Sequence, residues 1–467
     1  MNNFINRNQE LTQLQKLYES SKSKLAILYG RRRLGKTYLL KEFSQHLPHC
    51  YFMADKAGKQ SLKSNMALAL SLALDEPLMQ KMEYPTWYDL FSAFDRFRNR
   101  DEKFIFIIDE YQYLCQVDSG FSSYIQKWWD EKWQDDNIML ILCGSVTSMM
   151  YKETMADSSP LYGRAAAQIL IAPFSYHHIQ DFLPDKTEND LIEMFALSGG
   201  VPRYMELLQE HSSMAEALSN LVLNKNGILY SEARYLLHEE ISTPNTCWSI
   251  LHALGSGTTK ISELGSRLAL PANQLTRYID LLKDLFLVKR EVPILEKNPA
   301  KSKKGIYLVD DFFVRLWFGA IYPYDSFLEF GQREQILERL APLIRQHIAY
   351  CYEQMCRDFI KVNRQHFDIV RLGRQWGKDY EIEICGVDKN NHLSLIGECK
   401  WSHKKIGISV LDSLQQKIAQ HNLPLAKAPT YCLFSKSGFT PALMEKSKES
   451  SSNLNIMLFD SLFSAKW

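Results

Sequence analysis

The sequence Gly30-Arg31-Arg32-Arg33-Leu34-Gly35-Lys36-Thr37 has the GxxxxGK[ST] spacing of a phosphate loop. It follows the apolar run Leu25–Tyr29 and precedes a helix-like segment, Tyr38–Phe43. In such a loop, backbone N–H groups face a polyphosphate, Lys36 reaches the β- and γ-phosphates, and the Thr37 hydroxyl binds Mg²⁺. The pattern predicts a site for ATP and Mg²⁺ formed by all eight residues. A chance glycine-rich turn is the alternative, and the strand–loop–helix order argues against it.

A second apolar run, Lys103–Ile108, ends in Asp109 and Glu110. Such a run is typical of a buried parallel strand in a doubly wound sheet. We expect Asp109 to hold the water shell of Mg²⁺ and Glu110 to polarise the water that attacks the γ-phosphate. The alternative is a strand that merely ends in two acids. Together with the phosphate loop upstream, the pair predicts ATP hydrolysis.

A third apolar run, Ile138–Cys143, is followed by Gly144 and Ser145. The Ser145 hydroxyl would then lie beside the other two strand ends, where it could sense the γ-phosphate. Further along, Arg164 is a candidate for stabilising charge in the transition state, either in its own subunit or in a neighbour of a homo-oligomer. A surface salt bridge is the alternative for Arg164.

The composition is that of an ordinary globular protein. The chain has 467 residues, of which 46% are apolar and 23% charged, with a net charge of +1. This length predicts two to four domains. The nine cysteines form no CxxC pair, which favours buried reduced thiols over zinc sites or disulfides. No export signal and no run of about eighteen apolar residues is present, so we expect a soluble cytoplasmic protein that does not associate with membranes.

The middle of the chain has the pattern of a winged helix. Helices are expected at 246–254, 261–268 and 274–285, and strands at 287–292 and 305–309. The candidate recognition helix carries Arg277 and Lys283, and the predicted wing carries Lys297, Lys301, Lys303 and Lys304. These cations would suit phosphate contacts to duplex DNA. A solvated loop, or a module that contacts protein, is the alternative.

A second group of candidate residues lies near the C-terminus. The apolar strand Ser394–Trp401 contains Glu398 and Lys400, which share one face because they are two residues apart. A preceding strand with Glu383 would form a hairpin with it. Two carboxylates bind Mg²⁺ or Mn²⁺ through oxygen, while the ammonium orients a water or offsets phosphate charge. A solvated strand end is the alternative.

The motifs GRRRLGKT, IIDEYQYL, PLYGR and GGVPRY, in this order, resemble the archaeal-type ATPase family of P-loop proteins, a STAND/AAA-related group also found in bacteria. The resemblance extends from the opening motif at 4–11 to the Gly-Gly-x-Pro segment at 199–202. It implies that Asn6 and Arg7 flank the adenine and that the strand-end Ser145 senses phosphate. It also implies that Pro202 caps the nucleotide from a small helical lid.

The C-terminal segment resembles the PD-(D/E)xK restriction-endonuclease-like core, which follows this ATPase in many family members. The resemblance implies an α-β-β-β-α-β order, with Gln415 as a polar residue near the site. It also implies catalytic roles for Glu353, Glu383, Glu398 and Lys400, with Glu383 and Glu398 as metal ligands. Glu383 stands where aspartate is usual, and its longer side chain would shift the ion by about one methylene. A nuclease fold kept only for binding is the alternative.

The sequence therefore predicts an α/β chain of three domains. These are a P-loop NTPase with a parallel sheet and helical lid at 1–235, a winged helix and connector at 236–329, and a small α/β restriction-endonuclease-like domain at 330–467. The predicted function is ATP binding and hydrolysis in a protein that acts on DNA, with a metal-dependent nuclease site. The alternative is a nucleotide-switched scaffold in which the later domains only bind.

Overall fold

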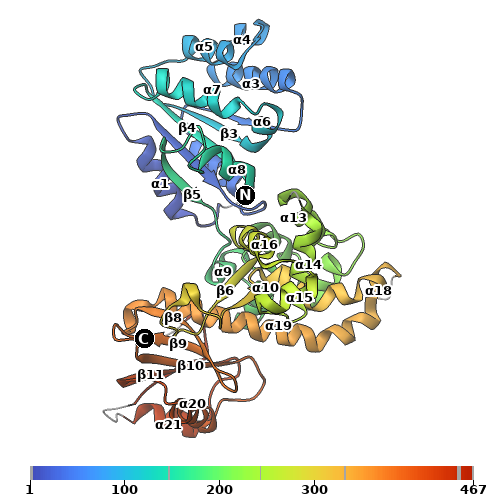
Figure 1. Ribbon diagram of the computed structural model, residues 1–467, viewed down its shortest axis with the longest axis vertical. Coiled ribbons are helices and arrows are strands. Elements are labelled where there is room, and N and C mark those ends of the chain that lie inside the picture. Colours follow the sequence, from blue (N-terminus) through green and yellow to red (C-terminus); the bar gives the residue numbers. More distant parts are fainter. Residues whose placement is uncertain (1–3, 146–147, 242, 331–332, 450–453, 465–467) are drawn as a thin grey trace. The chain divides into compact units, whose positions relative to one another are not determined.

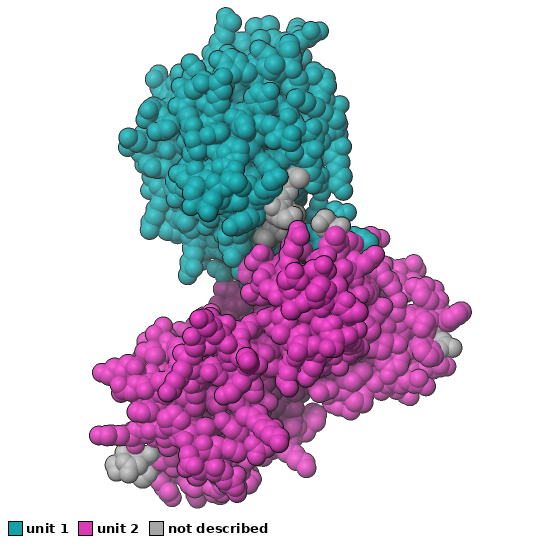
Figure 2. Space-filling model, viewed as in Figure 1, with its two compact units in different colours: residues 1–173, 236–242 teal, residues 174–235, 243–467 magenta. Residues whose placement is uncertain are grey.

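The computed structural model describes residues 4–145, 148–241, 243–330, 333–449 and 454–464. The chain divides into two compact units, coloured separately in Figure 2. Unit 1 comprises Met1–Pro173 and Leu236–Ser242, and unit 2 comprises Phe174–Tyr235 and Thr243–Trp467. Residues 174–235, which the sequence placed in the ATPase domain with its lid, thus group with the winged helix and the C-terminal sheet. The division into three domains at 235 and 329 stays a prediction.

Unit 1 contains a five-stranded parallel sheet in the order β2-β3-β4-β1-β5. The strands are β1 (Lys24–Tyr29), β2 (His49–Met53), β3 (Phe104–Asp109), β4 (Ile138–Gly144) and β5 (Ala165–Leu170). Every residue of β3 and β4 is buried, as expected for central strands covered on both faces. The predicted parallel sheet is confirmed, and the three apolar runs form its centre.

Helices cover both faces of this sheet. In Figure 1, α3, α5 and α7 lie together beside β3 and β4, and α1 lies beside β5. The aromatic and aliphatic side chains of α3, α5 and α7 form one core with alternate residues of the strands. The helices of unit 1 are α1 (Asn8–Tyr18), α2 (Lys36–Ser44), α3 (Lys59–Leu74), α4 (Leu78–Lys81), α5 (Trp87–Phe97), α6 (Tyr111–Val117), α7 (Phe121–Trp128) and α8 (Ser148–Thr154).

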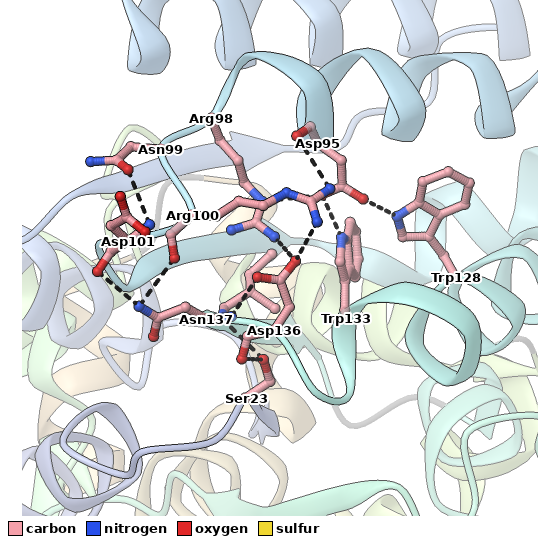
Figure 3. Close-up of polar contacts among 11 residues, drawn as sticks. Ser23, Asp95, Arg98, Asn99, Arg100, Asp101, Trp128, Trp133, Asp136 and Asn137 are labelled. Atoms are coloured by element: carbon pink, nitrogen blue, oxygen red, sulfur yellow. Dashed lines mark hydrogen bonds and ion pairs between the residues drawn. The ribbon is translucent and has the colours of Figure 1, made fainter.

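A buried ion-pair network lies before the amino ends of β3 and β4 (Figure 3). Arg98 has a fully buried side chain and donates to Asp95 at 3.1 Å and also to Asp136. Asp95 additionally accepts the indole N–H groups of Trp128 and Trp133 at 3.0 and 2.9 Å. The network therefore fixes α5 and the turn after α7 to the loop that enters β4.

Replacing Asp95 with alanine is expected to lower the free energy of unfolding of unit 1 by about 3–5 kcal/mol. The substitution removes one of the two carboxylates that pair with the buried Arg98 and leaves two buried indole N–H groups without their acceptor. Urea denaturation of the full chain, followed by hydrogen exchange in β3 and β4, measures the loss. The exposed Asp101, in the same loop region, is the control, and Asp101→Ala should change the stability by less than about 0.5 kcal/mol. Equal effects of the two substitutions would contradict the role of the network.

Unit 2 contains a small helical region followed by the predicted winged helix. The helices are α9 (Ile179–Phe182), α10 (Glu188–Ser198), α11 (Pro202–Leu208), α12 (Met214–Ala217), α14 (Pro244–Gly255), α15 (Ile261–Leu268), α16 (Ala272–Asp284), α17 (Phe312–Leu316) and α18 (Asp325–Glu329). Strands β6 (Val288–Glu291) and β7 (Ile306–Val309) pair antiparallel and form the wing. The elements predicted for the winged helix are confirmed within about two residues. At the wing, Lys304 pairs with Glu296 at 3.4 Å.

The C-terminal part of unit 2 is a mixed sheet in the order β12-β11-β10-β9-β8. Its elements are α19 (Arg333–Val362), β8 (Arg371–Trp376), β9 (Glu381–Val387), β10 (Leu393–Lys400), α20 (Ile408–Gln420), β11 (Leu425–Ser435), α21 (Pro441–Lys448) and β12 (Asn455–Phe459). Figure 1 shows α19 on one side of this sheet and α20 with α21 on the other. From α19 onward, the order α-β-β-β-α-β is the one expected from the sequence, and the β9–β10 hairpin is confirmed.

Candidate functional site

The predicted nucleotide residues of unit 1 meet at the carboxyl edge of its parallel sheet. Tyr29 at the end of β1 pairs with Gly144 at the end of β4, and β4 pairs in turn with β3. Gly30 follows β1 and Ser145 follows β4, while β3 ends at Asp109 and is followed by Glu110. Because parallel strands end at one edge, the phosphate loop, the strand-end serine and the two acids at the end of β3 lie at that edge. The Ser145 side chain is buried.

The phosphate loop has a backbone that turns sharply before α2. Arg33 and Gly35 have φ angles of +65° and +86°, and α2 begins at Lys36. A Cβ at Gly30 would lie 2.5 Å from the Ile171 carbonyl oxygen, so only glycine fits there. Lys36 Nζ donates to the Gly30 carbonyl at 2.8 Å, which places the ammonium over the loop. Arg31 and Leu34 are buried within the loop.

Asp109 is the centre of a hydrogen-bond cluster. The Thr37 hydroxyl donates to Asp109 Oδ2 at 2.9 Å, and the Tyr51 hydroxyl donates to the same oxygen at 2.5 Å. Burial and the nearby Asp109 raise the pKa of Tyr51 far above its usual value, so this phenol stays a donor. Thr37 and Asp109 supply hard oxygen atoms beside the loop, which is the ligand type that Mg²⁺ takes in phosphate-loop sites. The residues present therefore fit the ion.

Glu110 is held in an unusual backbone conformation at the start of α6. Its φ angle is +53°, a left-handed conformation that is uncommon for a residue with a side chain. Gln112 donates to the Glu110 carboxylate and lies close against β4, where a Cβ at Gly144 would approach Gln112 Oε1 to 2.3 Å. Strained residues are characteristic of functional sites. Gln112 and Gly144 thus position the predicted catalytic acid, although no role was predicted for either residue from the sequence.

Arg7 supports the phosphate loop. Its guanidinium donates to the Leu34 carbonyl at 3.1 Å and to the Ala172 carbonyl at 2.7 Å, and it pairs with Glu10 at 3.1 Å. Burial lowers the pKa of Arg7, and Glu10 opposes this effect. Asn6, beside it, has a φ angle of +56°. The structure therefore places Arg7 against the phosphate loop itself. The predicted contact of Asn6 and Arg7 with adenine stays a prediction.

Two carboxylates after the start of α13 (Glu232–Glu240) bind Arg32 of the phosphate loop. Glu240 Oε1 accepts the Arg32 backbone N–H at 2.8 Å, and Glu239 pairs with the Arg32 guanidinium at 2.8 Å. The same guanidinium donates to the Tyr113 hydroxyl at 2.6 Å. Burial raises the pKa of Glu240, while Arg32, Lys36 and other nearby cations oppose this effect. The Glu240 carboxylate therefore accepts a hydrogen bond from a backbone N–H of the loop that is predicted to bind phosphate.

Replacing Glu240 with glutamine is expected to tighten ATP and ADP binding roughly tenfold. The amide keeps an acceptor for the Arg32 N–H but removes a charge that repels phosphate by on the order of 1–2 kcal/mol at separations of about 10 Å. Equilibrium titration with fluorescent nucleotides measures the change. Glu239→Gln is the matched control and should have a smaller effect, because the Glu239 side chain is 40% exposed. Unchanged or weaker binding by Glu240→Gln would contradict the expected repulsion.

The two other residues predicted for the nucleotide site lie in different surroundings. Arg164 forms a two-pronged ion pair with Asp130, at 2.8 and 2.7 Å, and this carboxylate raises its pKa. That geometry matches the salt-bridge alternative for Arg164. Pro202 begins α11 in unit 2, following two glycines with positive φ angles. Their roles toward nucleotide stay predictions.

The second cluster lies at the end of the β9–β10 hairpin in unit 2. Gly397 pairs with Ile384, so Glu398 and Glu383 are neighbours across the two strands. Lys400 Nζ lies 2.5 Å from Glu398 Oε1 and 3.6 Å from Glu383 Oε1. The Cys399 backbone N–H donates to Glu383 Oε2 at 2.6 Å. The structure therefore brings together the two acids and the lysine that the sequence singled out.

Residues from the flanking helices complete this cluster. Lys417 of α20 lies 3.9 Å from Glu398 Oε2 and was not predicted; Gln415, which was named, is two residues earlier on the same helix. Glu353 is on α19, and burial raises its pKa, while cations that include Arg357 and Lys400 oppose the rise. α19 therefore contributes the predicted third acid to the same electrostatic environment.

Burial and the neighbouring carboxylates raise the pKa of Glu383 to about 8. Burial alone would lower the pKa of Lys400, but Glu383 and Glu398 outweigh burial and raise it. Lys400 thus stays charged while Glu383 holds a proton at neutral pH. Carboxylate oxygens from two strands converge on one cation, so Glu383 and Glu398 would fit a divalent ion once Glu383 ionises. Across the described ranges, no group of three or more His, Cys, Asp or Glu side chains is arranged to hold a metal.

The raised pKa of Glu383 predicts a pH-dependent stability in metal-free buffer. Below about pH 4.5 the carboxyl is protonated in both the folded and the unfolded states. Between about pH 4.5 and 8 the unfolded state loses its proton first, so stability falls as the pH rises. Thermal unfolding of wild type in EDTA should show this fall. Glu383→Gln should flatten it, and Glu445→Gln, at an exposed position on α21, should not. An equal slope in wild type and Glu383→Gln would contradict the shift.

Comparison with protein families agrees with the geometry of unit 1. Residues 4–208 match the model of an ATPase domain predominantly from Archaea, and residues 317–413 match a model of archaeal and bacterial proteins of unknown function. The N-terminal part of the chain is thus similar to ATPase domains, which agrees with the predicted binding of ATP. The C-terminal match covers α19 and the hairpin that carries Glu383, Glu398 and Lys400.

Similar proteins occur in archaea. The uncharacterized protein MJECL04 of Methanocaldococcus jannaschii is 27% identical over 408 residues, which are 86% of this chain and 88% of that protein. The Walker-type ATPase Paby2304 of Pyrococcus abyssi is 20% identical with a TM-score of 0.49, covering 68% of this chain and 96% of its own. The ORC2 protein of Aeropyrum pernix in ADPNP–ADP complexes is 13% identical with a TM-score of 0.41, covering 73% and 97%.

Among the described residues, no helix combines the length and the apolarity needed to cross a bilayer.

Proposed function

We propose that this protein hydrolyses Mg·ATP at the phosphate loop and uses the cycle to regulate a metal-dependent phosphodiesterase that acts on DNA. In unit 1, Lys36 and the loop N–H groups would bind the phosphates, and Thr37 and Asp109 would hold Mg²⁺. The ion would neutralise charge that develops on the phosphates. Glu110, positioned by Gln112, would take the proton of the attacking water. The 2.9 Å bond between Thr37 and Asp109 supports this assignment.

The phosphodiesterase part of the proposal is carried by one observation. Lys400 Nζ lies within 2.5 and 3.6 Å of carboxylate oxygens of Glu398 and Glu383, on adjacent strands of one hairpin. A divalent ion bound by these acids would polarise a phosphoryl oxygen and a water, and Lys400 would offset the charge of the phosphate. The winged helix, with Arg277 and Lys283 on α16, would supply contacts to duplex DNA.

The proposal is tested by two assays on the purified full chain. ATP turnover is measured by phosphate release. Cleavage of supercoiled plasmid and of single-stranded DNA is measured with Mg²⁺ or Mn²⁺, each with and without ATP. Turnover of ATP together with metal-dependent nicking that responds to ATP would support the full proposal. Loss of nicking when the metal is chelated would distinguish the proposed nuclease activity from a contaminating activity that needs no metal.

A nucleotide-switched scaffold is the second candidate. It is favoured by the pKa of about 8 for Glu383, because a protonated acid at neutral pH is a poor metal ligand. In this case ATP would still bind and turn over slowly, and unit 2 would bind its partner without cleaving it. ATP hydrolysis without nicking at pH 7, and equally without nicking at pH 9, where Glu383 is ionised, would favour the scaffold.

A further inference from the structure

A strongly basic cavity lies within unit 2, bordered by β6 of the wing, by α19 and by β8. Its volume is about 510 Å³, within the range of sites for small ligands. Its lining includes six cations and two acids, so the formal charge of the lining is +4, from six minus two. The acids are Glu291 and Asp358, and the cations are Arg290, Arg357, Lys361, Arg364, Arg371 and Arg374.

Three residues that line this cavity have a buried N–H donor without an acceptor among the described residues. The donors are Gln354 Nε2, Arg357 Nη2 and Arg374 Nε. Each side chain is fixed by another of its atoms: Arg357 Nη1 donates to the Glu383 carbonyl at 2.7 Å, Gln354 Oε1 accepts from Lys289 at 2.6 Å, and Arg374 Nη1 pairs with Glu291 at 3.0 Å. Arg357 is only 8% exposed.

Buried donors without acceptors are costly, and in folded proteins they are normally satisfied. Three such donors, on residues that line one cavity together with six cations, favour a ligand that is rich in acceptors. Glu291 does not supply that negative charge, because Lys289 and Arg374 already pair with it at 3.1 and 3.0 Å. A phosphate group has several acceptor oxygens, no obligatory donor and a negative charge, and guanidinium groups bind it through paired hydrogen bonds.

We propose that this cavity is a phosphate-binding site, which takes a phosphate of a nucleic-acid strand or of a free nucleotide. The ligand oxygens would accept from Arg357, Gln354 and Arg374, and Lys361 and Arg364, which are exposed, would attract the charge from outside. Arg357 connects this cavity to the cluster of Glu383, Glu398 and Lys400, because it donates to the Glu383 carbonyl. The assignment of the ligand to a strand that is cleaved at Glu398 and Lys400 rests on the proposed function. The binding of phosphate does not.

The test uses the full chain with Lys36→Ala, which removes the phosphate-loop site, in EDTA so that no cleavage occurs. Binding of a fluorescent 5′-phosphorylated single-stranded DNA is measured by anisotropy across a range of salt. Lys361→Glu/Arg364→Glu should weaken binding at least about tenfold and lower the slope of log K against log salt by about 2. Lys427→Glu/Lys448→Glu, at two exposed positions of the same unit, is the matched control. Arg357→Gln should weaken binding with less change in slope.

Competition by inorganic phosphate and by AMP separates the two sources of the phosphate. Displacement of the labelled DNA by either small ligand at millimolar concentration indicates a free-phosphate or nucleotide site, and displacement by unlabelled strands alone indicates a nucleic-acid site. Both results support phosphate binding in the cavity. Binding by Lys361→Glu/Arg364→Glu that equals the control, or no binding of any probe by the wild-type cavity, overturns it. The binding is measured in EDTA and needs no cleavage, so a failure of the nuclease proposal leaves this result unaffected.

Discussion

Replacing Glu110 with glutamine is expected to lower ATP turnover by about 10²–10⁴-fold, the usual contribution of a positioned general base. The amide preserves the size of the side chain and an oxygen for Gln112, but it cannot accept a proton from water. ATP affinity should stay within a few-fold of wild type, because Lys36 and the loop N–H groups are unchanged. Phosphate release and equilibrium nucleotide binding, measured side by side, give the two quantities.

Two further variants make this result specific to Glu110. Glu102→Gln removes an exposed acid just before β3 and should leave turnover unchanged. Lys36→Ala should lose nucleotide binding as well as turnover, because the ammonium that neutralises the phosphates is gone. If Glu110→Gln hydrolyses ATP at the wild-type rate, another group activates the water.

Replacing Lys400 with alanine is expected to abolish metal-dependent nicking, with a loss of at least about 10²-fold, as for other groups that stabilise charge in the transition state. The substitution removes the cation that lies 2.5 Å from Glu398 and 3.6 Å from Glu383. ATP turnover by unit 1 should persist. Plasmid nicking in Mg²⁺ and in Mn²⁺, normalised to ATP turnover in the same preparation, is the measurement.

Lys405→Ala is the matched control, because Lys405 is exposed and follows the same strand by five residues. It should nick DNA as wild type does. Thermal unfolding should confirm that the Lys400→Ala protein is folded, since the substitution leaves two carboxylates without their cation. If wild type and Lys400→Ala are equally inert while ATP is still turned over, the nuclease proposal fails and the nucleotide-switched scaffold becomes the better account.

The elements that carry these residues could be predicted because their signals are local. The central strands β1, β3 and β4 are short apolar runs ending in glycine or acid, and the helices of the winged helix follow a 3.6-residue period. The alternation of β10 placed Glu398 and Lys400 on one face, and the turn before it gave the hairpin with Glu383. Each of these inferences needs a window of about ten residues, and the structure confirms the elements.

The partners of those residues could not be predicted in the same way. Tyr51 reaches Asp109 from a neighbouring strand, and Glu240 reaches Arg32 from 208 residues further along the chain. Neither Tyr51 nor Glu240 lies at a fixed distance in sequence from the motif that it contacts. A single sequence therefore gives no indication of these contacts. The three buried donors around the basic cavity come from α19 and β8, and only tertiary packing brings them together. Gln112 lies within the motif IIDEYQYL, but its contact with Glu110 depends on Gly144, which has no side chain to displace it.

The ion-pair network of Asp95, Arg98 and Asp136 lies before the amino ends of the strands whose carboxyl ends carry the ATP site. The sheet thus separates the residues that hold unit 1 together from those that do its chemistry. We therefore expect Glu110→Gln to give a folded protein that binds ATP and hydrolyses it far more slowly than wild type. Immobilised in that state, the protein would retain whatever dissociates after hydrolysis, and the captured molecules would identify what the ATP cycle controls.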